Sequence, residues 1–582
     1  MKKKQYIKIA CLSFLSMLAT SCLDLDPKAE LNDAIVWNKA SNFQLFANQF
    51  YTWTRDFHSS TTYMCATSDG PHSDWRSDLI AGSSVNTYSK GTNSIPEKDD
   101  NYTTLYTRIY YTNLLLNKAE SFADKSSIAV PVAEAKFFRA YCYFELVQIF
   151  GNVILVTKPL ELNSPELYTS RDDRSVVIDQ IVTDLRESTE GLPETAEAGR
   201  LTKAAAWAML SRVALYEGTW QKFHTNGSST ETNTERSTSL LGIAKDAANK
   251  VISSKRFQLF YNEKLGVESY RYMFILEDAD CNPARLTKSS NTEYILARRH
   301  RLEDGIGTNI TKGYLANATF VTRKWANLYL CSDGLPIDKS PLFKNYVGVT
   351  DEFQNRDNRM TTTLMQHGEK YWNNTTNNSR KTWDAEDLTR ALTLSVTSNS
   401  GYQNHKWAVE RLVADTQESM DYPVIRYAEV LLNYAEACYE LEGKISDTDL
   451  DLSLNLVRTR INPNMPKLSK LLVEGNNLSM REEIRRERTL ELVLEGFRID
   501  DLKRWATAPT EMVADQLGVQ YTGTWFESHW ATQSRSLNSD GCIILYDGRV
   551  WADKLYLYPL PSDQLQLNPR LEQNPGWTTS KN

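Results

Sequence analysis

Apolar residues recur at helical spacing in four long stretches of the chain. The stretches are residues 133–150, 200–220, 425–443 and 480–505. In the first of them Phe137, Tyr141 and Phe144 fall on one helix face, and further apolar residues widen that face. Small residues at four-residue spacing stand beside the bulky aromatic ones, which lets neighbouring helices approach closely. The pattern predicts a mainly α-helical fold with four long helices.

Glycines and a threonine mark where these helices should begin and end. Gly151, Gly218 and Gly443 stand at the ends of the first three stretches, where glycine commonly closes an α-helix. Thr202 precedes the apolar run of the second stretch and is its predicted N-cap. Helices with small and aromatic residues on adjoining faces stack in the manner of tetratricopeptide hairpins, so we expect a degenerate helical-repeat scaffold.

Two regions of the chain lack this periodicity. Residues 58–103 and 345–405 are rich in Ser, Thr, Asp, Gly and Asn, and tryptophan is interspersed in the second region. We expect long irregular loops there, with few short strands, carried by the helical scaffold. Binding residues tend to lie on loops of this kind.

The first 21 residues have the pattern of a secretion leader. Four lysines among the first eight residues precede a short apolar run, residues 9–19, which is too short to span a bilayer. Ala19, Thr20 and Ser21 then lead directly into Cys22, an arrangement that resembles a bacterial lipobox. We therefore expect removal of the leader and attachment of lipid to the Cys22 thiol, which would anchor the chain to a membrane. An ordinary secreted protein with an early cysteine is the alternative.

Composition narrows the classes of function. The chain has 582 residues and 41% hydrophobic content, which is enough for a sizeable core. Because the leader carries four lysines and no acidic residue, its removal changes the formal net charge from −7 to −11. An acidic chain without a basic run gives no support to nucleic acid as a partner. The 29 tyrosines and 14 tryptophans suit the surface of a ligand-binding protein.

Possible metal ligands have simpler structural explanations. Apart from Cys11 and Cys22, six cysteines are scattered without a CxxC pair, which excludes a zinc knuckle and leaves the disulfide state open. Glu487, Glu491 and Glu495 share one helix face, where stacked carboxylates could bind metal. Arginines close to them in the sequence favour a structural ladder of salt bridges instead.

His72 raises a second metal hypothesis. It lies among Asp69, Asp74 and Asp78, but a polar loop accounts for these residues more simply. The chain has no G-x-S-x-G elbow, P-loop or H-E-x-x-H sequence. Carboxylate pairs suited to glycoside hydrolysis meet only in three dimensions, so the sequence leaves them open. On these patterns we assign no cofactor and no metal site.

Nine sequence strings occur in the order found in one family of bacterial surface proteins. They are Cys22 with DLDP (24–27), FGNVILVTKPL (150–160), RLTKAAAWAMLSRVALYEG (200–218), SDGLPI (332–337), NRDNRM (355–360), GYQNHKW (401–407), YPVIRYAEVLLNYAEACYELEG (422–443), ERTLELVLEGFRIDDLKRW (487–505) and LYPLPSDQLQLNPRLEQNPGW (557–577). Together they resemble the SusD/RagB family of Bacteroidetes outer-membrane lipoproteins. The resemblance covers nearly the whole chain after the leader.

The resemblance implies a fold, a location and a partner. The fold is mainly α-helical with four tetratricopeptide-like units. Residues 22–230 would form an N-terminal SusD-like region, packed as one globular unit with a C-terminal region, residues 231–582. The location is the outer face of the outer membrane, where lipid on Cys22 is the anchor. The partner is a SusC-like TonB-dependent transporter, to which the protein would deliver captured glycan without catalysis.

Ligand sites in this family usually lie on loops before the first long helical hairpin and in the middle of the chain. A sugar ring has an apolar face that Trp and Tyr can cover and a polar rim that Asp, Asn and Arg can bind. The candidate ligand-binding residues are Trp75 and Tyr88 as platforms, Asp69, Arg76 and Asn86 as polar partners, and Trp372, Arg380, Trp383 and Tyr402 on later loops. Capture of peptides or another non-sugar nutrient, a surface glycoside hydrolase and a plain helical-repeat adaptor are the alternatives.

Overall fold

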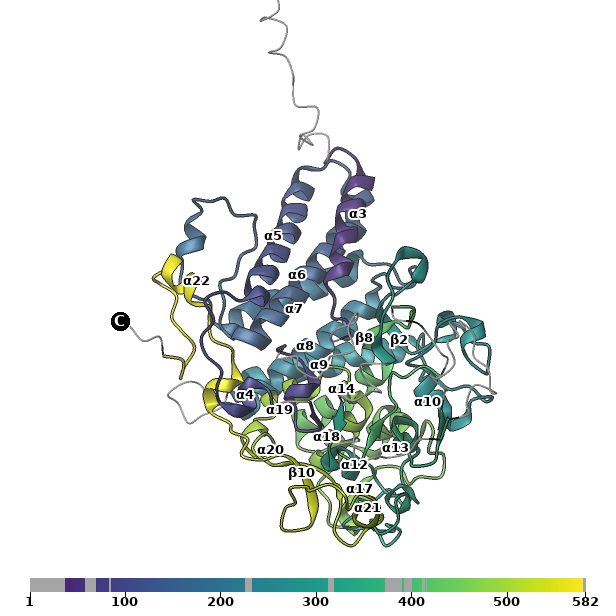
Figure 1. Cartoon of the computed structure of the whole chain (residues 1–582). Coiled ribbons are helices and arrows are strands. Elements are labelled where there is room, and N and C mark those ends of the chain that lie inside the picture. The colour runs from purple at the N-terminus through teal and green to yellow at the C-terminus, as the bar shows by residue number, and fades with distance from the viewer. Residues whose placement is uncertain are drawn as a thin grey trace, which may run out of the picture.

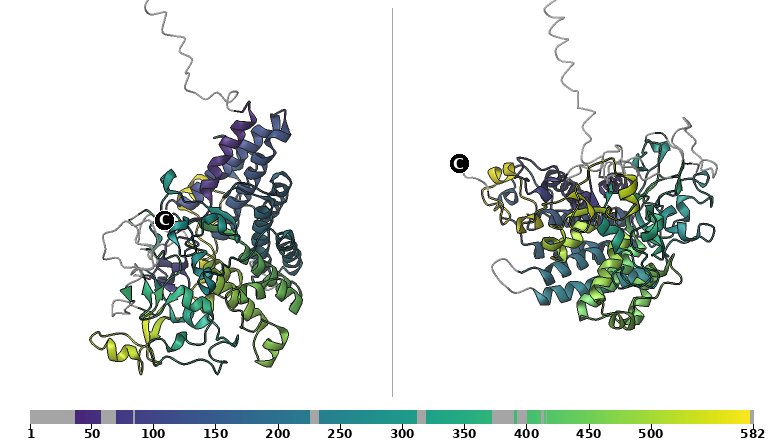
Figure 2. Two further views of the ribbon diagram at one scale, coloured as in Figure 1. Left: turned by 90° about the vertical axis from the view of Figure 1, so that its right-hand side faces the viewer. Right: turned by 60° about the horizontal axis from the view of Figure 1, so that its bottom comes forward.

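Helices dominate the computed structural model of the chain, as the sequence predicts, and the strands are short (Figure 1). The structure describes residues 37–57, 70–82, 85–225, 233–311, 319–371, 390–391, 400–410, 414 and 416–578. The long helices gather along one side of the molecule, whereas irregular segments and short strands gather on the other (Figure 2). No helix within the described ranges is both long enough and apolar enough to cross a membrane.

Successive helices pack against one another along the chain. The main helices are α3 (Ala40–Asn48), α5 (Asp100–Ser121), α6 (Ala129–Phe150), α7 (Arg174–Gly191), α8 (Lys203–Phe223), α9 (Thr234–Ser254), α14 (Tyr427–Glu442), α18 (Met480–Leu492) and α19 (Arg498–Arg504). Helix α5 contacts α6, α6 contacts α7, α7 contacts α8, and α8 contacts α9. Helix α14 then packs on α8 and α9 and contacts α18. The grouping of these helices into four tetratricopeptide-like units stays a prediction.

Residues on both sides of the predicted boundary between positions 230 and 231 share this helical layer. Helices α8 and α9 lie on either side of the boundary and contact each other, and α14 contacts both. Arg212 on α8 forms a salt bridge of 2.6 Å with Glu429 on α14. One main core of buried apolar side chains draws on all of these helices. The boundary itself stays a prediction from the sequence.

Several predicted helix ends are confirmed. Helix α6 ends at Gly151, whose φ is +74°, and its amide donates to the carbonyl of Val147. Helix α14 ends at Gly443, which is left-handed with a φ of +68°. The side chain of Thr202 caps α8 by accepting a hydrogen bond from the amide of Ala205. These ends depend on the conformation or side chain of one residue, which is why a local pattern predicts them.

Two other predictions about helix ends are wrong. Helix α8 continues past Gly218, because this glycine provides room for α9: a Cβ there would lie 3.0 Å from Leu241 Cγ. The stretch 480–505 forms two helices, α18 and α19, and not one. Leu494 and Gly496, with φ values of +60° and +76°, turn the chain between them.

Five two-stranded antiparallel sheets complete the regular structure of the described residues. The pairs are β1 (Ile80–Ala81) with β3 (Phe320–Val321), β2 (Tyr294–Arg298) with β8 (Tyr422–Arg426), β4 (Leu364–Met365) with β7 (Gln403–Asn404), β5 (Lys370–Tyr371) with β6 (Arg390–Ala391), and β9 (Gln516–Gln520) with β10 (Cys542–Tyr546). Strand β8 is buried throughout and leads directly into α14. The β2–β8 pair is therefore attached to the helical layer.

Short helices connect these elements. They are α4 (Thr87–Lys90), α10 (Ser269–Tyr272), α12 (Arg323–Leu328), α13 (Asn358–Thr363), α15 (Asp447–Leu452), α16 (Leu454–Thr459), α17 (Lys470–Gly475), α20 (Ala508–Glu511), α21 (Trp525–His529) and α22 (Ser562–Leu567). Two 3-10 turns, η1 (Gln49–Trp53) and η3 (Asp74–Arg76), lie near the candidate site.

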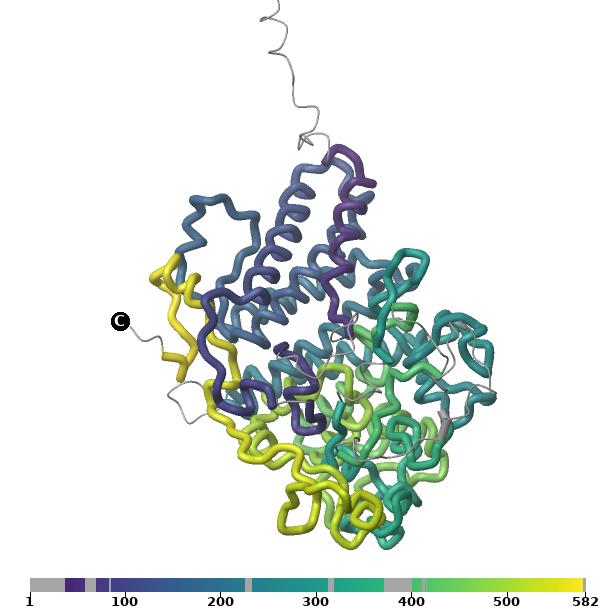
Figure 3. Tube along the Cα trace, viewed as in Figure 1, coloured from purple at the N-terminus to yellow at the C-terminus, as the bar shows by residue number. Residues whose placement is uncertain are grey.

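The C-terminal segment runs beside the irregular segment that precedes α5 (Figure 3). The amide of Val550 donates to the carbonyl of Ser89 at 2.9 Å, and the amide of Ser562 donates to the carbonyl of Pro96 at 3.0 Å. The chain end thus covers a loop that lies near the chain start.

The carboxylates of α18 belong to a buried network of ion pairs, which confirms the structural interpretation. Arg359 on α13 lies 2.6 Å from Glu487 and 3.1 Å from Glu491. Arg426 on β8 lies 2.7 Å from Glu491 and 2.7 Å from Glu495. The partners therefore come from distant elements. The arginines within residues 480–505, which the sequence favoured, pair with other carboxylates.

Candidate functional site

The first predicted ligand loop folds into a packed cluster. Trp75 and Arg76 lie in η3, and only 3% and 2% of their surfaces are exposed. The Arg76 guanidinium lies 4.0 Å from the centre of the Tyr88 ring and 5.0 Å from that of Tyr558, to whose hydroxyl it also donates. The side-chain oxygen of Asn86 caps α4. The structure thus brings these four predicted site residues together.

This packing corrects the expectation that the loop presents open aromatic platforms. The ring of Trp75 lies in the main core, and Tyr88 stacks on Tyr558 with ring centres 4.9 Å apart. Tyr558 comes from the C-terminal segment. The sequence of the loop alone therefore does not predict that Tyr558 stacks on Tyr88. Among the later candidates, Tyr402 is also buried, and its hydroxyl donates to the Glu352 carboxylate at 3.0 Å. Both residues lie far from this cluster in the sequence.

The other candidates lie outside the described residues, and their roles stay predictions. These candidates are Cys22, Asp69, Trp372, Arg380 and Trp383.

A cavity of about 360 Å³ lies beside the packed cluster, between η1, α5 and α6. We name it the Trp53 cavity. Its lining includes Trp53, Arg55, Asp56, Gly70, His72, Asp100, Asn101, Thr104, Arg108, Glu145 and Tyr422. Part of its lining, residues 53–56 and 70–72, precedes the first long helical hairpin, α5–α6, where the resemblance places ligand sites. Sequence reasoning missed Trp53, although this tryptophan stands just before the polar region that begins at residue 58.

The floor of the Trp53 cavity is a buried charge cluster. The Nδ1 atom of His72 lies 2.7 Å from Asp500, and its Nε2 atom lies 2.9 Å from Glu145. Arg55 Nε donates to the same Glu145 at 2.8 Å. Burial and Arg55 oppose protonation, but the two carboxylates outweigh them and raise the pKa of His72 above its ordinary value. His72 is thus a partner of two carboxylates. The described ranges contain no group of three or more His, Cys, Asp or Glu side chains placed to hold a metal.

The same charges determine the chemistry of the two floor carboxylates. Burial raises the pKa of Glu145 and of Asp500, but His72 and Arg55 outweigh burial and hold both values below their ordinary range. Both groups are therefore ionised and already paired. A general acid needs a raised pKa, so this floor favours recognition over proton transfer.

The wall and rim of the cavity combine an aromatic ring with polar groups. Trp53 is partly buried against Phe50, with ring centres 4.6 Å apart. The Arg108 guanidinium lies 5.8 Å from the centre of the Trp53 ring and donates to the Trp53 carbonyl at 3.3 Å. Asp100 and Asn101, at the start of α5, add hydrogen-bonding groups at the rim. This combination suits a ligand with an apolar face and a hydroxylated edge.

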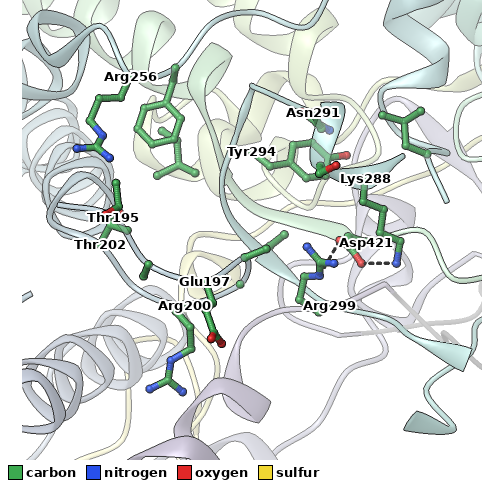
Figure 4. A pocket seen from close by; sticks show the side chains of 18 of the residues that line it. Thr195, Glu197, Arg200, Thr202, Arg256, Lys288, Asn291, Tyr294, Arg299 and Asp421 are labelled. Carbon is green, nitrogen blue, oxygen red and sulfur yellow. Dashed lines mark hydrogen bonds and ion pairs between the residues drawn. The ribbon is translucent and has the colours of Figure 1, made fainter. Parts of the chain in front are cut away.

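A second cavity of about 420 Å³ lies between the α7–α8 loop and β2 (Figure 4). Asp421 stands in its wall with Arg299 on one side and Lys288 on the other. We name it the Arg299 pocket. It shares no lining residue with the Trp53 cavity.

A third cavity, about 590 Å³, is a groove beside α5. Tyr110, Tyr111 and Tyr168 line it and are exposed, as are several leucines. The amides of Asn113 and Asn568 donate to backbone carbonyls of residues 156–169. The groove therefore offers mainly apolar contacts, which suit sugar hydroxyls less well than the Trp53 cavity does.

Comparison with known proteins decides the family. A model of the SusD family matches residues 289–577, and a second model, described as starch-binding and associating with the outer membrane, matches residues 22–215. The chain belongs to the SusD family. Among individual SusD relatives, a SusD-like protein of Formosa agariphila is 30% identical over 129 residues, which are 21% of this chain and 24% of that protein. A second SusD-like protein of the same organism is 21% identical over 87% of this chain and 92% of its own length.

The solved structures share the fold. A SusD-like carbohydrate binding protein from Bacteroides fragilis superposes with a TM-score of 0.70 at 22% identity, over 92% of this chain and all of that one. The SusD-like relatives with higher identity match over shorter segments. In these matches the chain spans only about a quarter of the relative's length or less. The family and the fold of this SusD protein are thus shown, and its ligand is a matter for proposal.

Proposed function

We propose that this protein captures glycan at the bacterial cell surface and delivers it to a SusC-like TonB-dependent transporter. The observation that carries the proposal is the match of SusD family models to residues 22–215 and 289–577. A solved protein of the same fold is described as carbohydrate binding, and one family model is described as starch-binding and associating with the outer membrane. The Trp53 cavity supplies suitable chemistry. Lipid on Cys22 would hold the protein on the outer face of the outer membrane.

Capture in the Trp53 cavity would rely on several weak contacts. The ring of Trp53 covers the apolar C–H face of a sugar, and Asp100 and Asn101 bind its hydroxyls. Arg108 is already held by the Trp53 carbonyl, so little ordering is needed when a ligand binds. A polymer that crosses several such contacts gains affinity through effective concentration. No covalent step is required.

The test compares variants of the soluble protein that begins at Leu23. Trp53→Ala should weaken binding of an oligosaccharide at least about tenfold in titration calorimetry, because the aromatic contact is lost. Tyr261→Ala is the matched control, since Tyr261 is exposed and lines none of the three cavities. Asn101→Ala at the rim should weaken binding less and leave the melting temperature unchanged. Equal affinities in all variants would remove the Trp53 cavity from the site.

Two other activities have distinct outcomes in the same preparation. Capture of peptides is the alternative within the family, since the charged floor of the cavity suits peptide termini. Binding of a peptide digest without binding of any glycan would establish peptide capture. A glycoside hydrolase would release reducing sugar from a polysaccharide. The paired state of Glu145 and Asp500 argues against that activity, because neither is protonated to act as a general acid.

A further inference from the structure

We propose that the Arg299 pocket binds the carboxylate or sulfate group of an acidic sugar unit in the captured glycan. The inference rests on the proposed function and deepens it by naming a class of glycan. The pocket is lined by the α7–α8 loop, the segment after α9, residues 273–291, strand β2 and Asp421. Its volume of about 420 Å³ is in the range of small-molecule sites.

One wall of the pocket carries a surplus of positive charge. Asp421 is buried, with Lys288 Nζ at 2.9 Å and Arg299 Nε at 3.0 Å, and the two cations approach it from opposite sides (Figure 4). Lys288 also donates to the carbonyl of His300 at 2.5 Å. One carboxylate is therefore shared by two cations, which leaves one positive charge unbalanced at this wall.

The facing wall, on the α7–α8 loop, is close to balanced in charge (Figure 4). Glu194 lies 3.6 Å from Arg256, which lines the pocket, and 3.3 Å from Lys203, which does not. Arg200 turns toward α6, where it pairs with Glu134 at 2.7 Å and takes no part in this balance. Glu197 is exposed on the same loop and offsets the remaining positive charge of this wall. The unbalanced positive charge is therefore confined to the wall where Lys288 and Arg299 share Asp421.

Arg299 is held in one orientation before any ligand binds. Its Nε edge contacts Asp421, while its two Nη groups make no hydrogen bond to any described residue, and 33% of the side chain is exposed. The stem of Arg299 lies against Gly199, whose φ is +86°, and a Cβ there would come within 2.6 Å of Arg299 Cγ. Glycine at this position therefore allows the loop to support the guanidinium.

The free Nη edge determines the class of ligand. A guanidinium binds the paired oxygens of a carboxylate or sulfate through parallel N–H groups. Phe257 and Tyr294 also line the pocket, and their rings can cover the apolar face of the sugar that carries the acidic group. A neutral sugar would make only the second kind of contact. The pocket should therefore distinguish acidic from neutral sugar units.

The experiment is titration calorimetry of the soluble protein that begins at Leu23, with three probes. The probes are a galacturonate trisaccharide, a sulfated galactose disaccharide and a neutral galactose trisaccharide. We expect one acidic probe to bind at least about tenfold more tightly than the neutral probe at 50 mM salt, with a smaller difference at 300 mM salt. The two acidic probes separate carboxylate from sulfate recognition.

Variants then assign this binding to the pocket. Arg299→Gln should remove the preference for the acidic probe. Arg299→Lys keeps the charge and the pairing with Asp421 but lacks the planar Nη edge, so it should weaken binding while the protein stays folded. Arg301→Gln is the matched control, because Arg301 is exposed and does not line the pocket.

Two results would overturn the inference. Equal affinities for acidic and neutral probes would do so, as would unchanged acidic binding in both Arg299 variants. In either case binding of a neutral polysaccharide that depends on Trp53 would still support the proposed function, so the two failures are distinguishable.

Discussion

Replacement of Glu491 by glutamine should destabilise the protein by about 3–5 kcal/mol, the usual cost of removing one partner from a buried ion pair. The Glu491 carboxylate is fully buried and contacts Arg359, Arg426 and Arg460. These three arginines outweigh burial, which alone would raise the pKa of Glu491, and hold it below its usual range. Glutamine has nearly the same shape, so the substitution opens no cavity; it removes the charge and replaces one acceptor oxygen with an NH2 donor.

The magnitude follows from what remains after the charge is lost. Three arginines that converge on one carboxylate would face one another across a neutral amide in a water-excluded site. Arg426 also pairs with Glu495 and Glu293, each at 2.7 Å, so the network is weakened and not abolished. This remaining pairing places the expected loss within the range for a single broken pair.

The matched control lies on the same helix. Glu482 lies in the first turn of α18, its side chain is 62% exposed, and it lies 3.7 Å from Arg485. Glu482→Gln should change the free energy of unfolding by at most about 1 kcal/mol, because water screens exposed pairs. Guanidinium denaturation of both variants, followed by tryptophan fluorescence and circular dichroism, measures the difference. If Glu491→Gln unfolds at the same midpoint as Glu482→Gln, the network does not stabilise the fold and the reasoning is refuted.

Two further predictions concern a helix end and a buried acid. Gly443→Ala should lower the free energy of unfolding by about 1–2 kcal/mol, because Gly443 is left-handed and a Cβ there meets nothing within 4 Å, so backbone strain is the main effect. Gly475 is equally open but has no positive φ, so Gly475→Ala should not lower it. Equal effects of the two substitutions would contradict the account. Burial raises the pKa of Asp74 to about 7, well above an unfolded value of about 3.9. The folded state therefore binds this proton more tightly, so Asp74 should make stability fall as the pH rises from about 4 to about 7. Asp74→Asn should flatten that slope while an oxygen still accepts from the Gly496 amide, and parallel pH profiles for the two proteins would count against it.

Local sequence signals predict a helix end only where one residue determines it. Gly151 and Gly443 adopt positive φ angles and end their helices, as the pattern indicates. Gly218 carries the same signal but lies inside α8, because its small size serves contact with Leu241 of α9. Periodicity over residues 480–505 likewise missed the turn at Leu494, since apolar spacing continues through it.

The candidate site was harder to predict, because its burial depends on segments far apart in the sequence. Trp75 and Tyr88 lie in a segment whose composition is typical of a binding loop, but Trp75 is buried in the main core and Tyr558, from the other end of the chain, stacks on Tyr88. Trp53 ends the 3-10 turn η1, and its place beside α5 becomes visible only in the fold. The three glutamates are an intermediate case: Glu487 and Glu491 lie on α18 as predicted, but Glu495 lies beyond its end, and their arginine partners were not predictable from the sequence.

The most direct test of glycan capture is native affinity electrophoresis of the soluble protein that begins at Leu23. The gels contain a panel of neutral and acidic polysaccharides, and a protein without glycan affinity is run beside it. The account predicts retardation by at least one polymer. Unchanged mobility in every gel, with circular dichroism showing a folded helical protein, would contradict it.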